Sequence, residues 1–223
     1  MRSLKFLRLI FAGLGLCSFA MAQNIVQNPG FETGSFAPWV ENDWGLDFYG
    51  SGGAHTGNYY AYTGCVGAGC ITPAPGSGAY LYQDLPTTPG ATYTLTFWYF
   101  PGPSGGDNIA ELQVLWGPTA TQLTTGGAGS CTGNCVFDNN SIGSDTYVQY
   151  TVTNLVATSA TTRLEFLGRQ DPSADGLDDV AVVLTQSPTV PTLSTWAMCI
   201  LAILLVCVGA WLLKPRFCPV PKA

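Results

Sequence analysis

The nine residues TYTLTFWYF (Thr92–Phe100) indicate the fold class of this chain more clearly than any other stretch. Their side chains fall into two alternating rows, with Tyr93, Leu95, Phe97 and Tyr99 on one side and Thr94, Thr96, Trp98 and Phe100 on the other. A period of two residues is typical of a β-strand that places one face against a core. The stretch therefore predicts a half-buried strand.

Seven more short runs of aromatic and β-branched residues extend this pattern along the chain. They are Trp44–Tyr49, Tyr59–Tyr62, Tyr80–Leu85, Ala110–Trp116, Thr146–Val156, Thr162–Leu167 and Val180–Leu184. Turn-forming clusters such as Pro86–Gly90 and Gly126–Gly133 separate them, and residues 23–185 show no helical period. Many short strands at this spacing predict a β-sandwich or barrel.

The N-terminus has the features of a secretory signal peptide. Arg2, Lys5 and Arg8 are basic, the apolar run Leu9–Phe19 follows, and Ala20-Met21-Ala22 is a small-residue exit. This order is typical of a segment that is removed on export. We expect cleavage after Ala22 and an exported protein.

The C-terminus carries the uncharged run LSTWAMCILAILLVCVGAWLL (Leu193–Leu213). At about 1.5 Å per residue, a helix of this length would cross a hydrocarbon core of roughly 30 Å. Lys214, Arg216 and Lys222 follow it, and positive residues keep such an end in the cytoplasm. We therefore expect the membrane as a partner, with the rest of the mature chain facing outward.

These observations divide the chain into five parts. The predicted layout is a signal peptide over 1–22, a β-sandwich over 23–184, a Pro/Thr-rich linker over 185–192, a transmembrane helix over 193–213 and a basic tail over 214–223. The part outside the membrane has only Arg163 and Arg169 against all 14 Asp and Glu residues, a formal net charge of −12. Such a surface repels phosphate backbones, which excludes nucleic acid as a partner, and it attracts cations.

Four cysteines lie in the predicted sandwich, as CVGAGC (Cys65, Cys70) and CTGNC (Cys131, Cys135). An even number in an exported chain indicates two disulfides, and the short Gly-containing loops favour the two local pairs among the three possible connectivities. The alternative is a four-thiolate zinc site, although its usual two-residue spacings are absent.

Three stretches resemble the galactose-binding-like jelly rolls found in several carbohydrate-binding modules and bacterial surface proteins. They are NIVQNPGFETGSFAPW (Asn24–Trp39), LYQDLPTTPGATYTLTFWY (Leu81–Tyr99) and the closing GLDDVAVV (Gly176–Val183). The resemblance implies an all-β jelly-roll sandwich over residues 23–184.

The segment VPTLSTW resembles the IPTL-CTERM sorting signal of exported bacterial proteins. The matching residues are Val190, Pro191, Thr192, Leu193, Ser194 and Trp196, with Val190 in place of the usual Ile and Thr195 in place of the usual Glu. The resemblance implies recognition by an exosortase-type sorting protease and cleavage near Pro191. A plain membrane anchor is the alternative.

Carboxylates near the first and last predicted strands are candidates for a structural calcium. In the jelly rolls that the chain resembles these strands lie close together, and carboxylate oxygens there often hold calcium, a metal that prefers oxygen ligands. Alternation would send Asp178 and Asp179 to opposite faces, so we expect Asp179 to face Glu32. Solvated carboxylates at strand ends are the alternative.

Aromatic residues in the first third of the chain are candidates for stacking on sugar rings. They are Trp39, Trp44, Tyr49, Tyr59 and Tyr60. The alternative is that they fill the core, as aromatic side chains commonly do in sandwiches.

Catalysis has weaker sequence support. His55 is the only histidine and no nucleophile-elbow spacing accompanies it, so a polar surface residue is expected. The acidic stretch Gly168–Asp179 is expected to be a solvated turn, with a second cation loop as the alternative, although its spacing does not match a calcium hand motif. The sequence thus favours a non-enzymatic surface or matrix protein that binds polysaccharide. A structural envelope protein without a defined ligand and a secreted glycan-active hydrolase are the alternatives.

Overall fold

The computed structural model describes residues 23–48, 53–102, 109–142, 144, 146–188 and 195–212. Outside these residues lie the predicted signal peptide, the tail 214–223 and Tyr49. Residues 189–194, which end the predicted linker and begin the sorting motif, also lie outside them. The chain divides into two compact units, Met1–Pro188 and Thr189–Ala223. Their boundary falls within the predicted linker 185–192.

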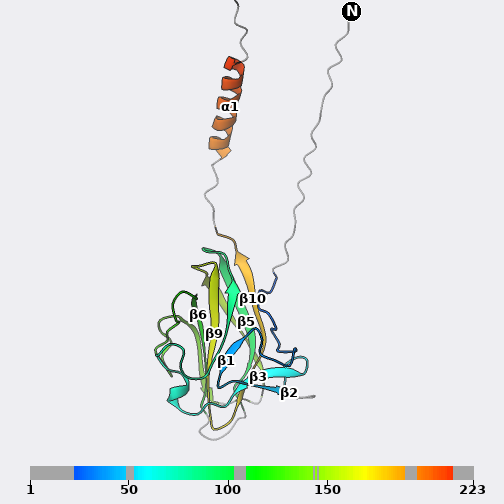
Figure 1. The fold of residues 1–223 in the computed structure, drawn as a ribbon, viewed down its shortest axis with the longest axis vertical. Helices are drawn as coiled ribbons and strands as arrows, with labels where there is room; N and C mark the ends of the chain where they lie inside the picture. The colour runs from blue at the N-terminus through cyan, green and yellow to red at the C-terminus, as the bar shows by residue number, and fades with distance from the viewer. Residues whose placement is uncertain are drawn as a thin grey trace, which may run out of the picture. The chain divides into compact units, whose positions relative to one another are not determined.

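The first unit consists of two five-stranded antiparallel sheets packed face to face (Figure 1). The first sheet has the order β1 (Val40–Asn42), β4 (Tyr80–Pro86), β9 (Thr161–Asp171), β6 (Ile109–Pro118) and β7 (Cys135–Ile142). The second has the order β2 (Gly45–Phe48), β3 (Tyr59–Thr63), β10 (Asp175–Gln186), β5 (Thr92–Phe100) and β8 (Val148–Val156). The predicted all-β sandwich is confirmed.

The core lies between the two sheets, where the inner rows of β5, β9 and β6 meet. Phe97 of β5 is fully buried and packs edge-on against Phe166 of β9, with ring centroids 5.4 Å apart. Each such fully buried apolar side chain stabilises the fold by about 1.5–3 kcal/mol. The alternation in Thr92–Phe100 therefore corresponds to a half-buried strand, as predicted.

Two strands were not predicted, β1 and β7. β7 carries the polar run Asp138-Asn139-Asn140 and lies at the edge of its sheet, beside β6. Pairing with a neighbour, rather than its own apolar pattern, makes it a strand.

The predicted solvated turn over Gly168–Asp179 is wrong, because most of this stretch belongs to β9 and β10. Asp175 is 1% exposed, and it accepts hydrogen bonds from the Tyr99 hydroxyl at 2.8 Å and from the Thr63 N–H at 3.2 Å. Burial raises the pKa of Asp175 to about 7, although these hydrogen bonds oppose the rise.

Two loops cover part of the outer face of the first sheet. One follows β3 and includes the 3-10 turn η1 (Ala68–Cys70), and the other joins β6 to β7. Their side chains form a second small apolar cluster with the sheet, made of Ile71, Leu115, Leu123 and Leu167. The Ala128 N–H donates to the Ile71 carbonyl at 3.0 Å, so the two loops also contact each other.

Both predicted local disulfides are present. Cys65 is bonded to Cys70 in the first of these loops, and Cys131 to Cys135 in the second. Since all four sulfur atoms are used in this way, they do not form the alternative zinc site.

The second unit contains the helix α1 (Thr195–Leu212). It lies within the predicted transmembrane helix over 193–213, of which residues 193, 194 and 213 are outside the described residues. Across the part of the chain that the structure describes, no helix has the length and apolar character needed to cross a membrane. The transmembrane helix over 193–213 stays a prediction.

Candidate functional site

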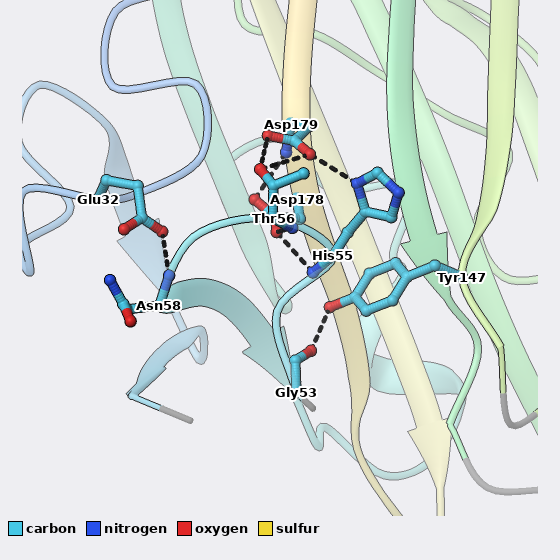
Figure 2. A network of polar contacts seen from close by, with 8 residues as sticks. All are labelled: Glu32, Gly53, His55, Thr56, Asn58, Tyr147, Asp178 and Asp179. Atoms are coloured by element: carbon cyan, nitrogen blue, oxygen red, sulfur yellow. Dashed lines mark hydrogen bonds and ion pairs between the residues drawn. The ribbon is translucent and has the colours of Figure 1, made fainter. Parts of the chain in front are cut away.

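A loop between β2 and β3 is held against the sandwich by acidic side chains (Figure 2). The backbone N–H groups of His55 and Thr56 donate to Asp178 Oδ2 at 2.8 and 3.1 Å. The Thr56 hydroxyl donates to Asp179 at 2.8 Å, and His55 Nδ1 lies 2.6 Å from Asp179 Oδ2. Both aspartates therefore fix the same loop.

A β-bulge explains why both aspartates reach this loop. The pairing of β10 with β5 shifts register between Asp178 and Ala181, and Asp179 has a φ of 49°. A bulge places two residues opposite one and redirects their side chains. The prediction that alternation would separate Asp178 from Asp179 is therefore wrong.

Glu32 approaches the loop from the other side. Its Oε1 accepts a hydrogen bond from the Asn58 N–H at 2.8 Å (Figure 2) and another from the Tyr59 N–H at 2.9 Å. Gly57 makes this approach possible, because a Cβ there would lie 2.3 Å from Glu32 Cδ. The φ of +67° at Gly57 also favours glycine.

The side chains of all three acids pass close to Gly30, and only the two aspartates present oxygen atoms to it. A Cβ added to Gly30 would lie 3.3 Å from an oxygen of both Asp178 and Asp179 and 3.8 Å from Glu32 Cγ. Burial raises the pKa of Asp178 to about 6; the Thr56 N–H opposes this and the Asp179 charge adds to it. The site therefore concentrates negative charge, and protein donors stabilise it.

The predicted calcium ligands thus lie in one region, but each is already hydrogen-bonded. Among the residues that the structure describes, no group of three or more His, Cys, Asp and Glu side chains is arranged to hold a metal ion. Calcium at Glu32 and Asp179 stays a prediction.

His55 differs from the expected polar surface residue. Its ring stacks on Trp98 with a centroid distance of 3.7 Å and an interplanar angle of 14°. It also contacts the edge of Tyr147, whose hydroxyl donates to the Gly53 carbonyl at 2.8 Å. His55 therefore anchors the loop, with 26% of its side chain exposed.

The two predicted sugar-stacking tryptophans are core residues. Trp39 is 4% exposed and Trp44 is 6% exposed, and Trp39 packs between Phe31 and Phe166. Neither ring presents a face to solvent, so the prediction of Trp39 and Trp44 as a sugar platform is corrected.

The other predicted aromatic residues lie apart from these tryptophans. Tyr59 and Tyr60 are half-buried on β3, where Tyr59 contacts Phe48 and the Tyr60 hydroxyl donates to Asp47 at 3.2 Å. The four candidates that the structure describes do not form one site.

A different aromatic site lies on the outer face of the first sheet. It is a cavity of about 170 Å³ lined by Gly76, Tyr80, Tyr82, Gln122, Leu123, Arg163 and Glu165. β4 and β9 form its floor, with Tyr82 paired to Glu165 across the two strands. Gly76 and Gln122 come from the two loops that cover this face.

The polar groups of the cavity form a connected set. The Arg163 guanidinium lies 3.6 Å from the centroid of the Tyr82 ring and donates to both carboxylate oxygens of Asp84, at 2.7 and 3.0 Å. Glu165 is 6% exposed, and burial raises its pKa to about 7, although the charge of Arg163 opposes the rise. The cavity thus combines aromatic rings with an arginine and a buried carboxyl group.

This cavity was missed from the sequence, although one signal for it was present. The alternation in Tyr80–Leu85 places Tyr80 and Tyr82 on one face and the buried Leu81 on the other. An outward row of tyrosines is visible in that pattern. The loops that turn the row into a cavity are not.

Comparisons with known structures place the sandwich among jelly-roll folds. TmCBM61, solved in complex with β-1,4-galactotriose, is 18% identical, with a TM-score of 0.50, covering 74% of this chain and 100% of that one. The CBM22-1 xylan-binding domain from Paenibacillus barcinonensis Xyn10C is 12% identical, with a TM-score of 0.50 and coverage of 74% and 97%.

The same fold also occurs in an enzyme. The Stig cyclase Fisc from Fischerella sp. TAU is 18% identical, with a TM-score of 0.50, covering 75% of this chain and 100% of that one. At these identities the likeness establishes the fold and does not transfer an activity. No protein-family model and no curated protein sequence matches the chain.

Proposed function

We propose that this protein is a non-enzymatic glycan-binding module that acts outside the cytoplasm and holds a sugar in the cavity over β4 and β9. The observation that supports this most is the composition of the cavity. Tyr80 and Tyr82 offer aromatic surface, and Gln122, Arg163 and Glu165 offer polar groups to bond hydroxyls. Ligand sites commonly combine such surfaces with a few placed polar groups.

The charges of the cavity favour a neutral sugar. Arg163 already bonds Asp84 through two N–H groups, so its charge is compensated. Glu165 and Asp84 would repel a uronate or a sulfate group. A ligand rich in hydroxyls, by contrast, can donate to the Glu165 carboxylate.

Replacing Tyr82 tests the location of the site. Tyr82→Ala removes an aromatic wall and the ring beneath Arg163, and should weaken glycan binding about tenfold or more. Tyr62→Ala, on the outer face of the opposite sheet, is the matched control and should bind like wild type. Binding is measured by calorimetry on the full chain with hits from a glycan array, with β-1,4-galactotriose and xylan as first probes.

Three outcomes separate the alternatives. Equal binding by the two variants would place the site elsewhere. Absence of binding to every glycan would favour the structural envelope protein. Hydrolysis of a polysaccharide that depends on Glu165 would show that the protein is the glycan-active hydrolase of the second alternative.

The pH dependence of binding tests the role of Glu165. Hydroxyl donors bond an ionised carboxylate more strongly than a neutral one. Because the Glu165 pKa is raised to about 7, affinity should increase several-fold as the pH rises through that value and level off above it. Glu165→Gln should bind with little change between about pH 6 and about pH 8. If Glu165→Gln still showed a rise in affinity as large as that of the wild type, Glu165 would be excluded as the acceptor.

Export and sorting are part of the proposal. Residues 1–22 would direct export, and Val190–Trp196 would present the sorting motif to an exosortase-type protease. The two disulfides support an oxidising location, since such bonds are rare in the cytosol.

Mass spectrometry of the protein recovered from its native host tests this part. The expected product begins at Gln23, ends near Pro191 and has Cys65, Cys70, Cys131 and Cys135 oxidised. Recovery of the intact chain with reduced thiols would contradict both export and sorting.

A structural calcium at Glu32 and Asp179 is also proposed. The nearness of the Glu32 side chain and the Asp179 carboxylate to Gly30 supports it, and backbone carbonyls and water would complete the usual ligand number. Calcium would have to replace hydrogen bonds that these oxygens now accept from loop 53–59.

Thermal unfolding with and without calcium tests this site. Calcium should raise the melting temperature of the wild-type chain, and Glu32→Gln should lose part of that rise, because the amide supplies a weaker ligand while still accepting from Asn58. Glu41→Gln, an exposed glutamate on β1, is the control. A rise of wild-type size in Glu32→Gln would exclude Glu32 as a ligand.

A further inference from the structure

A second pair of acidic side chains lies on the outer face of the first sheet, apart from Glu32 and Asp179. Glu111 is on β6 and Asp138 on the neighbouring β7. The side-chain amide of Gln113 donates to Glu111 Oε1 at 3.0 Å and to Asp138 Oδ2 at 3.4 Å. One amide nitrogen therefore brings the two carboxyl groups together.

The loop between β6 and β7 closes over this pair. The Gly129 N–H donates to Glu111 Oε1 at 2.6 Å, and the Gly127 carbonyl accepts from the Gln113 amide at 3.0 Å. The Thr125 hydroxyl donates to Gln113 Oε1. As a result Glu111 is fully buried, with 0% exposure.

Hydrogen-bond donors are too few for the acceptors in this pocket. The two hydrogens of the Gln113 amide serve three acceptors, from Glu111, Gly127 and Asp138. Glu111 Oε2 and Asp138 Oδ1 are both buried and have no hydrogen-bond partner. A buried carboxylate oxygen without a donor is costly, so an occupant with positive charge is expected.

Arg169 compensates Glu111 only in part. It lies opposite Glu111 in the β6–β9 register and its charge lowers the pKa of Glu111, but its guanidinium is hydrogen-bonded to Asp171. Burial raises the pKa of Glu111, against the Gly129 hydrogen bond, and the charge of Asp138 raises it further. Burial likewise raises the pKa of Asp138. Ionising both acids in this pocket is therefore electrostatically unfavourable.

We propose that Glu111 and Asp138 bind a hard divalent cation of the calcium type, through Glu111 Oε2 and Asp138 Oδ1. Oxygen is the ligand type that such cations prefer, and neither sulfur nor imidazole ligands are among the contacts of this pair. Only two acidic side chains contribute, so backbone carbonyls and water would have to complete the ligand set. The bound cation would fix the loop that carries Gln122 and Leu123 to the sheet.

The experiment uses the full chain with Glu32→Gln as the parent, so that the other proposed calcium site is weakened. Calcium chloride is titrated by calorimetry and by thermal unfolding. At about a hundredfold excess over Kd the melting temperature of this parent should rise by roughly 5–10 °C. Magnesium chloride is the second probe.

Adding Glu111→Gln should abolish this rise and the calorimetric binding event. The new amide offers a donor hydrogen where Oε2 now lacks a partner, so the variant should fold without cation at least as stably as its parent. Asp138→Asn should also abolish the rise and the binding event, and it replaces Glu111→Gln in the experiment if that variant does not fold. Glu41→Gln is the matched control and should keep the rise.

Three results would overturn the proposal. One is a parent that binds neither calcium nor magnesium, including the case in which its stability depends only on pH, as expected for a proton shared by the two acids. Another is a cation response that survives both Glu111→Gln and Asp138→Asn. The third is loss of the response in Glu41→Gln as well, which would show a general charge effect.

Discussion

A shortage of basic side chains constrains this structure throughout. With only Arg163 and Arg169 between residues 23 and 192, most buried carboxylates must find their donors in the backbone or in hydroxyl groups. Asp178 accepts from three N–H groups, and Asp175 from Tyr99 and Thr63. All of these bonds except the one from the Asp179 N–H join distant parts of the chain. The acids thereby fix loops to the sheets, while the core supplies most of the stability.

The two arginines are used in a consistent way. Both lie on β9, Arg163 pairs with Asp84 and Arg169 pairs with Asp171. Glu111, under the β6–β7 loop, lies opposite Arg169 in the strand register, but its Oε2 lacks a hydrogen-bond donor, and it is the acid at which we propose a bound cation. The outer face of the first sheet thus combines the cavity, both arginines and this acid.

The strands could be predicted where the sequence alternates strongly, and less well elsewhere. Thr92–Phe100 was predicted with the bounds that β5 has, because its apolar row faces a core. β7 was missed because edge pairing, not its own pattern, makes it a strand. The nearness of Glu32 to Asp179 followed from a resemblance, but the bulge that turns Asp178 to the same loop depends on tertiary pairing that no local pattern shows. Likewise, Trp39 and Tyr82 are both aromatic, and residue type does not distinguish the buried ring of Trp39 from the cavity-lining ring of Tyr82. Their positions in the folded chain determine this difference.

The contact between the two loops over the first sheet has a consequence for the cavity. Each loop contributes lining residues, Gly76 from one and Gln122 and Leu123 from the other, and each contains a disulfide that closes only residues 65–70 or 131–135. Cys70 is buried in the core between the sheets, so the first loop is also held from below. Because the Ala128 N–H donates to the Ile71 carbonyl, a displacement of one loop would shift the other, and opposite walls of the cavity would move together.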